Sequence, residues 1–126
     1  MKNKFVIKKC NSCGALVEVL KDCNCKNCGI VCCGKNMETL SPNSTDASVE
    51  KHLPVYEVVG NYVVASVPHV MESEHFIEFL GLSSNNINAK KYFKAGETAK
   101  AVFPYVKGAT LYAYCNKHGL WTCEIQ

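Results

Sequence analysis

The sequence predicts an all-β protein in two parts, a small metal-binding domain followed by a seven-stranded β-sandwich. Three observations lead to this fold class. The 126 residues suffice for one ordinary domain and a small appendage. Seven of the nine cysteines lie between Cys10 and Cys33. The second part alternates short β-branched and aromatic runs with turn residues, a pattern typical of a β-sandwich or barrel.

The cysteine-rich segment, residues 1–38, forms the first predicted domain. A module of under ~40 residues usually needs a metal or disulfides to stay folded. A metal is favoured because the number of cysteines is odd, no export signal is visible and most cysteines have a close cysteine or histidine neighbour. A tetrahedral set of thiolates suits iron or zinc, and Cys10 and Cys13 combined with Cys25 and Cys28 would make a zinc-ribbon or rubredoxin-like set.

Residues 39–48 are polar and turn-forming and are predicted to be a linker. The sandwich domain is predicted to cover residues 49–126. Its seven strand-like runs are residues 55–59, 62–67, 76–82, 90–95, 100–106, 109–114 and 120–125. No run keeps a helical period over about 11 residues, so little helix is expected.

The dipeptide Gly60-Asn61 suits a two-residue hairpin turn because both residues tolerate positive φ. This turn would pair Val59 with Tyr62, so the residue numbers of every cross-strand pair would add up to 121. Continuing the ladder places His52 opposite His69. The sequence therefore predicts that two of its four histidines lie together.

The other two histidines lie in loops that can reach the same end of the sandwich. His75 begins the run 76–82, and His118 follows Cys115 by three residues. Cys115 and His118 taken alone also fit a thiolate nucleophile with its base, or a buried thiol beside a turn. Five donors suit iron better than zinc, because zinc usually has three or four protein ligands and octahedral iron would keep one open position.

Three segments, EKHLPV (50–55), SVPHVMESEHFIEF (66–79) and YCNKHGLW (114–121), resemble the motifs of the superoxide reductase family. With CNSCG (10–14) and VCCG (31–34), they are similar to desulfoferrodoxin, the two-iron form of that family. The resemblance implies a desulforedoxin-like domain followed by an immunoglobulin-like sandwich. It also implies an enzyme that reduces superoxide to hydrogen peroxide by one electron.

The resemblance assigns roles to residues at the matching positions. It implies that four histidines and one cysteine bind the catalytic iron: His52, His69, His75 and His118 in the equatorial plane and Cys115 as the axial ligand. It implies that Lys51 attracts superoxide and that Glu50 closes on the ferric iron. It implies a second site, for iron or zinc, formed by Cys10, Cys13, Cys32 and Cys33.

The chain departs from the family pattern in its surplus thiols, Cys23, Cys25 and Cys28, which could be alternative ligands, a redox disulfide or an added metal site. The single Cys123 is expected to be a small core residue. The eight strand aromatics, among them Trp121, are expected in the core or on the sheet surface.

The net charge of +3 is too small to indicate nucleic-acid binding. No apolar run approaches the ~18 residues of a membrane span, so a cytoplasmic protein is expected. The resemblance implies a rubredoxin-like electron donor and a homodimer. Two rival functions remain at this stage: an electron carrier in which only the cysteine site is active, and a zinc-stabilised interaction module without activity.

Overall fold

The computed structural model describes residues 5–25, 29–44 and 49–126, without the side chains of residues 49 and 50. The chain divides into two compact units, Lys4–Ser41 and Pro42–Gln126. The described residues contain twelve β-strands and a single helix of four residues, α1 (Val49–His52). The predicted all-β class is therefore confirmed.

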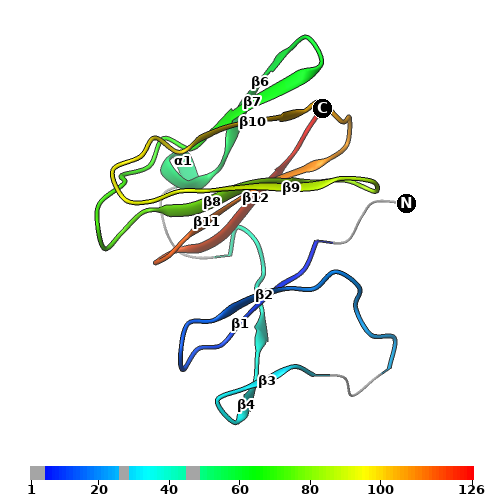
Figure 1. Ribbon diagram of the computed structural model, residues 1–126, viewed down its shortest axis with the longest axis vertical. Helices are drawn as coiled ribbons and strands as arrows, with labels where there is room; N and C mark the ends of the chain where they lie inside the picture. Colours follow the sequence, from blue (N-terminus) through cyan, green and yellow to red (C-terminus); the bar gives the residue numbers. More distant parts are fainter. Residues whose placement is uncertain (1–4, 26–28, 45–48) are drawn as a thin grey trace. The chain divides into compact units, whose positions relative to one another are not determined.

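The N-terminal unit consists of two small sheets (Figure 1). The first has the order β2-β1-β5, from β1 (Ile7–Lys9), β2 (Leu16–Glu18) and β5 (Glu38–Thr39). The second is the hairpin of β3 (Val31–Cys32) and β4 (Lys35–Asn36). Its buried apolar residues among those described are few: Val6, Ile7, Cys10 and Met37. Such a small core agrees with the expectation that a metal stabilises this unit.

The C-terminal unit is a sandwich of two antiparallel sheets (Figure 1). One sheet has the order β10-β7-β6, from β6 (Val55–Val59), β7 (Tyr62–Ser66) and β10 (Lys100–Pro104). The other has the order β12-β11-β8-β9, from β8 (Ile77–Ser83), β9 (Asn88–Tyr92), β11 (Thr110–Cys115) and β12 (Gly119–Glu124). The first, second and fifth strands share one sheet and the third, sixth and seventh the other, as in immunoglobulin-like sandwiches.

All seven predicted strands of the sandwich are present, and the predicted hairpin register is confirmed. β6 pairs with β7 from Val59 opposite Tyr62 to Val55 opposite Ser66. The sequence reasoning assumed that the ladder continues to His52. This assumption is wrong, because His52 is the last residue of the helix α1. Pro54, which has no N–H to donate, lies between the helix and the strand and prevents further pairing.

The core lies between the two sheets and contains alternate residues of their strands. Its members include Val63 and Ala65 of β7, Ala101 and Phe103 of β10, Ile77, Leu80 and Leu82 of β8, and Leu111, Ala113 and Cys115 of β11. On the outer face of the larger sheet, Tyr112 lies across Gly81, where an added Cβ would come under 3.0 Å from its ring. A glycine is required at this point of β8 because the ring occupies the space of a side chain.

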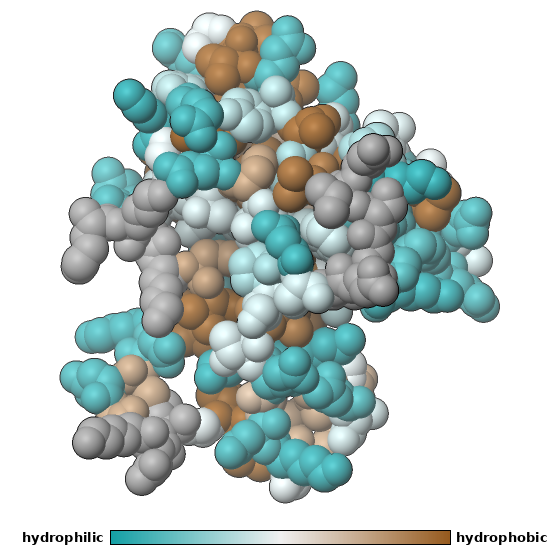
Figure 2. Space-filling model, turned by 180° about the vertical axis from the view of Figure 1, so that it is seen from behind, coloured by the Kyte–Doolittle hydropathy of each residue, from teal (hydrophilic) through white to brown (hydrophobic). Residues whose placement is uncertain are grey.

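The outward face of the smaller sheet is apolar. Val55, Val59, Tyr62 and Val102, which the strand register places on one face, are each more than half exposed. Figure 2 shows hydrophobic side chains at the surface over the β6–β7 hairpin, at the top of the view. In the described part of the chain, no helix has the length and hydrophobicity required to cross a membrane.

Candidate metal centres

The five predicted donors of the sandwich lie where strands begin or end at one end of the fold. His52 precedes β6 and His69 follows β7, while His75 precedes β8. Cys115 is the last residue of β11, and His118 lies in the turn that leads to β12. The start of β6 lies beside the end of β7 in one sheet, and the start of β8 lies beside the end of β11 in the other, because each pair is antiparallel.

The structure brings these five side chains together, with their donor atoms all within 4.8 Å of one another. His118 Nδ1 lies 3.0 Å from His52 Nε2 and 3.2 Å from His75 Nε2. His69 Nε2 lies 3.2 Å from His52 Nε2. Cys115 Sγ lies 3.5 Å from His69 Nε2 and 3.7 Å from His118 Nδ1.

The four imidazoles are arranged around a centre. Neighbouring ring centroids are 4.6 to 4.9 Å apart in the order His52, His69, His75, His118 and back to His52. His52 and His75 are 6.4 Å apart and lie across the centre from each other. A metal at ~2.1 Å from four nitrogens in a square would separate neighbouring nitrogens by about 3.0 Å. The donor set therefore fits a metal ion with four equatorial nitrogens and one sulfur.

Contacts behind the imidazoles fix their orientation. His69 Nδ1 donates to the carbonyl of Val70, which leaves the Nε2 lone pair facing the other donors. Trp121 stacks on His52 with ring centroids 5.0 Å apart, and its Nε1 donates to the carbonyl of His118 at 3.1 Å. Sequence reasoning expected Trp121 in the core or on the sheet surface but gave no sign of these contacts.

His69 and His75 are suited to bind a cation as neutral ligands. Burial lowers the pKa of His69 and of His75, and the neighbouring imidazoles lower both further. An imidazole that is neutral near pH 7 does not have to lose a proton before it binds a metal.

The thiol of Cys115 is fully buried. Burial raises its pKa, whereas hydrogen bonds from the backbone N–H groups of Lys117 and His118 lower it. A β-bulge directs this residue, because the register of β11 against β8 shifts between Tyr114 and Cys115. A metal would stabilise the thiolate in this buried position.

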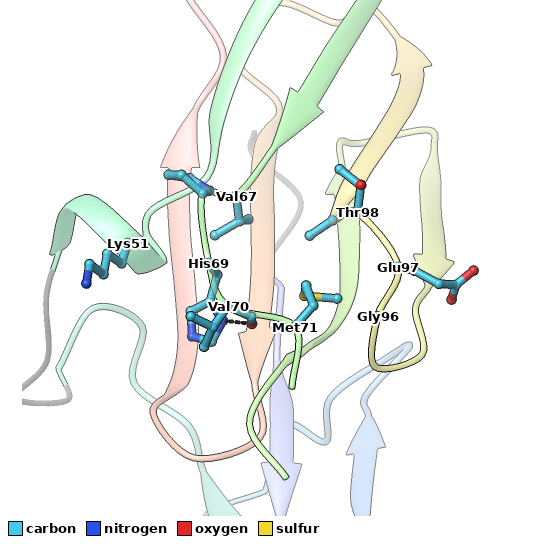
Figure 3. A pocket seen from close by; sticks show the side chains of 10 residues that line it. Lys51, Val67, His69, Val70, Met71, Gly96, Glu97 and Thr98 are labelled. Atoms are coloured by element: carbon cyan, nitrogen blue, oxygen red, sulfur yellow. Dashed lines mark hydrogen bonds between the residues drawn. The ribbon is translucent and has the colours of Figure 1, made fainter. Parts of the chain in front are cut away.

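An open pocket of about 550 Å³ lies beside His69. Figure 3 shows Val67, Met71 and Thr98 around it, with Lys51 on the side of α1 and the carboxylate of Glu97 directed away from it. Lys51, which the resemblance assigned to superoxide attraction, is exposed at this pocket. The side chain of Glu50 lies outside the described part of the structure.

The second predicted donor set also comes together in the N-terminal unit. The thiols of Cys10, Cys13, Cys32 and Cys33 form one group, with all four sulfurs within 4.8 Å of one another. Cys13 and Cys32 have their sulfurs 3.6 Å apart, and Cys32 and Cys33 have theirs 4.0 Å apart. Tetrahedral ligation at ~2.3 Å places sulfurs about 3.8 Å apart, so this group fits a four-thiolate metal site.

Two tight turns present these thiols. The Gly14 N–H donates to the carbonyl of Cys10 at 2.8 Å, and Gly14 has φ +82°. Cys33 and Gly34 connect β3 to β4, and both have positive φ, which identifies a two-residue turn of type I′. This conformation, rare for a cysteine, lets the adjacent Cys32 and Cys33 direct both sulfurs to one centre.

The four thiols perturb one another. A hydrogen bond from the backbone N–H of Cys13 lowers the pKa of Cys10 to about 6, and the thiols of Cys10 and Cys13 raise the pKa of Cys32 to about 12. Neighbouring thiols likewise raise the pKa of Cys33. Several thiolates in one place repel each other, so a cation is needed before all four can ionise.

The surplus cysteines lie outside both groups, as far as the structure describes them. Cys25 is exposed and not among the clustered thiols, and Cys23 takes part in a disulfide. Cys28 lies outside the described residues. In the described part of the chain, Cys10 and Cys13 cluster with Cys32 and Cys33 and not with Cys25, which the alternative set required. Cys123 is partly buried against the core and donates to the carbonyl of Pro54 at 3.4 Å.

A β-sandwich with a histidine and cysteine centre, preceded by a four-cysteine centre, defines a metalloprotein with two metal sites. The family model described as desulfoferrodoxin matches residues 44–124. The desulfoferrodoxin of Syntrophotalea carbinolica is 40% identical over 129 aligned positions, which cover 98% of this chain and 99% of the relative. The desulfoferrodoxin of Nitratidesulfovibrio vulgaris is 38% identical with the same coverage. The chain belongs to the desulfoferrodoxin family.

Solved structures share the fold. The superoxide reductase from Treponema pallidum matches 97% of this chain and 100% of its own with a TM-score of 0.73 and 22% identity. A superoxide reductase (neelaredoxin) from Archaeoglobus fulgidus matches 66% of this chain and 94% of its own with a TM-score of 0.53 and 27% identity. The match to the T. pallidum structure spans both units of this chain, whereas the match to the A. fulgidus structure covers two thirds of it.

Proposed function

We propose that this protein is a superoxide reductase, which adds one electron and two protons to superoxide and releases hydrogen peroxide without forming oxygen. The observation that carries the proposal is the group of four imidazoles and one buried thiol at the end of the sandwich. Membership of the desulfoferrodoxin family supports the substrate, and the A. fulgidus neighbour is itself described as a superoxide reductase.

We assign the catalytic metal as iron, held by His52, His69, His75, His118 and Cys115. When bound, ferrous iron supplies the electron. The imidazoles would bind it as neutral donors, and the thiolate of Cys115 would donate electron density to the iron. Five protein donors would leave an octahedral iron one position for a small anion.

The residues around the centre guide the reactants. Lys51 lies at the pocket beside His69, where a positive charge raises the rate at which an anion such as superoxide arrives. Glu50 belongs to the same helix, and we assign to it the closing of the site with a carboxylate oxygen. The two protons come from water.

The four thiols of the N-terminal unit are proposed to hold a second iron that relays electrons from a rubredoxin-like donor, or a zinc ion that stabilises the unit. Cys10, Cys13, Cys32 and Cys33 are its ligands. We further propose a cytoplasmic homodimer in which residues 1–38 and 49–126 fold as domains joined by residues 39–48.

Metal analysis, a visible spectrum and rapid-mixing kinetics with superoxide test this proposal together. We expect iron in the sandwich, an absorption band that His75→Ala abolishes, and one hydrogen peroxide per superoxide with no oxygen. A colourless protein that contains zinc alone would refute the enzyme. Superoxide turnover unaffected by His75→Ala would instead favour an electron carrier that uses only the cysteine site.

A further inference from the structure

The pairing of β8 with β11 is interrupted by a β-bulge next to the candidate iron site. Tyr114 pairs with Phe79, but the next residue, Cys115, pairs with Ile77. One residue of β8 is left over, and the regular ladder ends. Beyond the bulge, the backbone N–H of Asn116 still donates to the carbonyl of Phe76, at 3.3 Å.

The side chain of Asn116 continues the connection where the ladder has ended. Its Oδ1 accepts a hydrogen bond from the N–H of Phe76 at 3.0 Å, and its Nδ2 donates to the carbonyl of Glu74 at 3.0 Å. An N–H can only donate and a carbonyl can only accept, so these partners fix the orientation of the amide. The two bonds hold the backbone on both sides of His75.

The backbone of His75 itself is held within a tight bend. Its N–H donates to the carbonyl of Glu72 at 3.2 Å, and the N–H of Glu72 donates to the carbonyl of His75 at 3.0 Å. The bend is therefore rigid in itself, and Asn116 attaches it to the loop that carries Cys115 and His118.

From this arrangement we infer that Asn116 is a positioning residue for the metal: its amide sets His75 at the correct distance from Cys115 and His118. The inference rests on the proposed function in one respect, that these three residues bind one ion. Partners behind metal ligands typically account for a 10- to 100-fold difference in metal affinity. Asn116 differs from such partners in that it holds the backbone of the ligand and not its ring.

The chain offers a matched control in Asn43. Its N–H donates to the carbonyl of Leu120 at 2.9 Å, its Oδ1 accepts from the N–H of Thr122 at 3.0 Å, and its Nδ2 donates to the carbonyl of Thr122 at 3.1 Å. These are the same three kinds of bond, but they enclose Trp121, which supplies no donor atom. Because Trp121 stacks on His52, a small change in metal affinity is expected from this control as well. Asn43 also has φ +58°, so alanine there should disturb the fold at least as much as alanine at position 116.

The test measures iron affinity by competition with a chelator, and amide hydrogen exchange, in the full-length protein. We expect Asn116→Ala to lower iron affinity by about 10- to 100-fold, to shift the absorption band of the oxidised iron, and to speed exchange at the Phe76 amide. Asn43→Ala should change the affinity by less than about threefold, although it lowers the melting temperature. Equal losses of affinity in the two variants would overturn the inference.

If Asn116→Ala does not fold, Asn116→Asp tests whether the side-chain amide positions His75 for metal binding. The aspartate keeps the acceptor for the Phe76 N–H but places a second oxygen against the carbonyl of Glu74. We expect slow exchange at Phe76 with iron affinity at least about tenfold lower, and an unchanged affinity would overturn the inference. Wild-type protein that binds iron at this site but does not reduce superoxide would refute the proposed function and leave the role of Asn116 intact.

Discussion

Replacement of Gly81 by alanine should destabilise the sandwich strongly, because the ring of Tyr112 already fills the space that the new methyl group needs. Tyr112 is fully buried, and its hydroxyl donates to Asn88 Oδ1 at 2.7 Å. An added Cβ at Gly81 would approach the ring to under 3.0 Å, so the ring must move. The substitution lies in the β8–β11 pair; His75 lies just before β8, and Cys115 is the last residue of β11.

The expected loss is about 3 kcal/mol in the free energy of unfolding. Overpacking of a filled interior typically costs ~1–3 kcal/mol, and the displaced hydroxyl loses a hydrogen bond worth ~1 kcal/mol. With a urea m-value of about 1.5 kcal/mol/M, the unfolding midpoint should fall by about 2 M. Trp121 is the single tryptophan of the chain and is buried in the sandwich, so its fluorescence reports the unfolding of this unit.

Two further variants separate steric overlap from other causes. Gly96 has φ +88° with open space around its Cβ position, so Gly96→Ala should cost only the ~1–2 kcal/mol of a left-handed conformation. Tyr112→Leu removes the ring atoms nearest Gly81, and in that background Gly81→Ala should cost much less than it does alone. A midpoint shift under about 0.3 M for Gly81→Ala, or an equal shift in both backgrounds, would refute the steric explanation.

Three other predictions concern the metal sites. His75→Ala should remove the metal of the sandwich and leave that of the N-terminal unit, so metal analysis should show one fewer ion per chain; retention of both would contradict the ligand assignment. Lys51→Ala should slow the reaction with superoxide several-fold and weaken its dependence on ionic strength, whereas the control Lys107→Ala, at an exposed residue between β10 and β11, should do neither. The lowered pKa values of His69 and His75 mean that the unfolded chain binds more protons than the folded one near pH 6. The metal-free protein should therefore lose stability as the pH falls below about 6.5 in urea titrations; a stability that rises on acidification would contradict these shifts.

The sequence predicts the strands well because their signals are local. Alternating β-branched and aromatic residues mark each strand, and Gly60-Asn61 alone determines the register of β6 against β7. That register also brought His52 near His69, although the helix that carries His52 was not foreseen. Pro54, which breaks the ladder, was the available signal.

Other features could not be predicted because they depend on segments far apart in the sequence. The amide of Asn116 reaches Glu74 across 42 residues, and the stack of Trp121 on His52 joins β12 to α1. The positive φ of Cys33 follows from the turn between β3 and β4, which the sequence reasoning did not predict. Such contacts are determined by how the finished strands pack and not by the residues nearby in the chain.

The donors at the end of the sandwich come from both of its sheets. His52 and His69 flank strands of the smaller sheet, whereas His75, Cys115 and His118 flank strands of the larger one. A bound ion therefore also cross-links the sheets and closes a loop of 66 residues between His52 and His118. A covalent link over such a loop would be worth about 4 kcal/mol in chain entropy. Release of the metal and separation of the two sheets would therefore be coupled events.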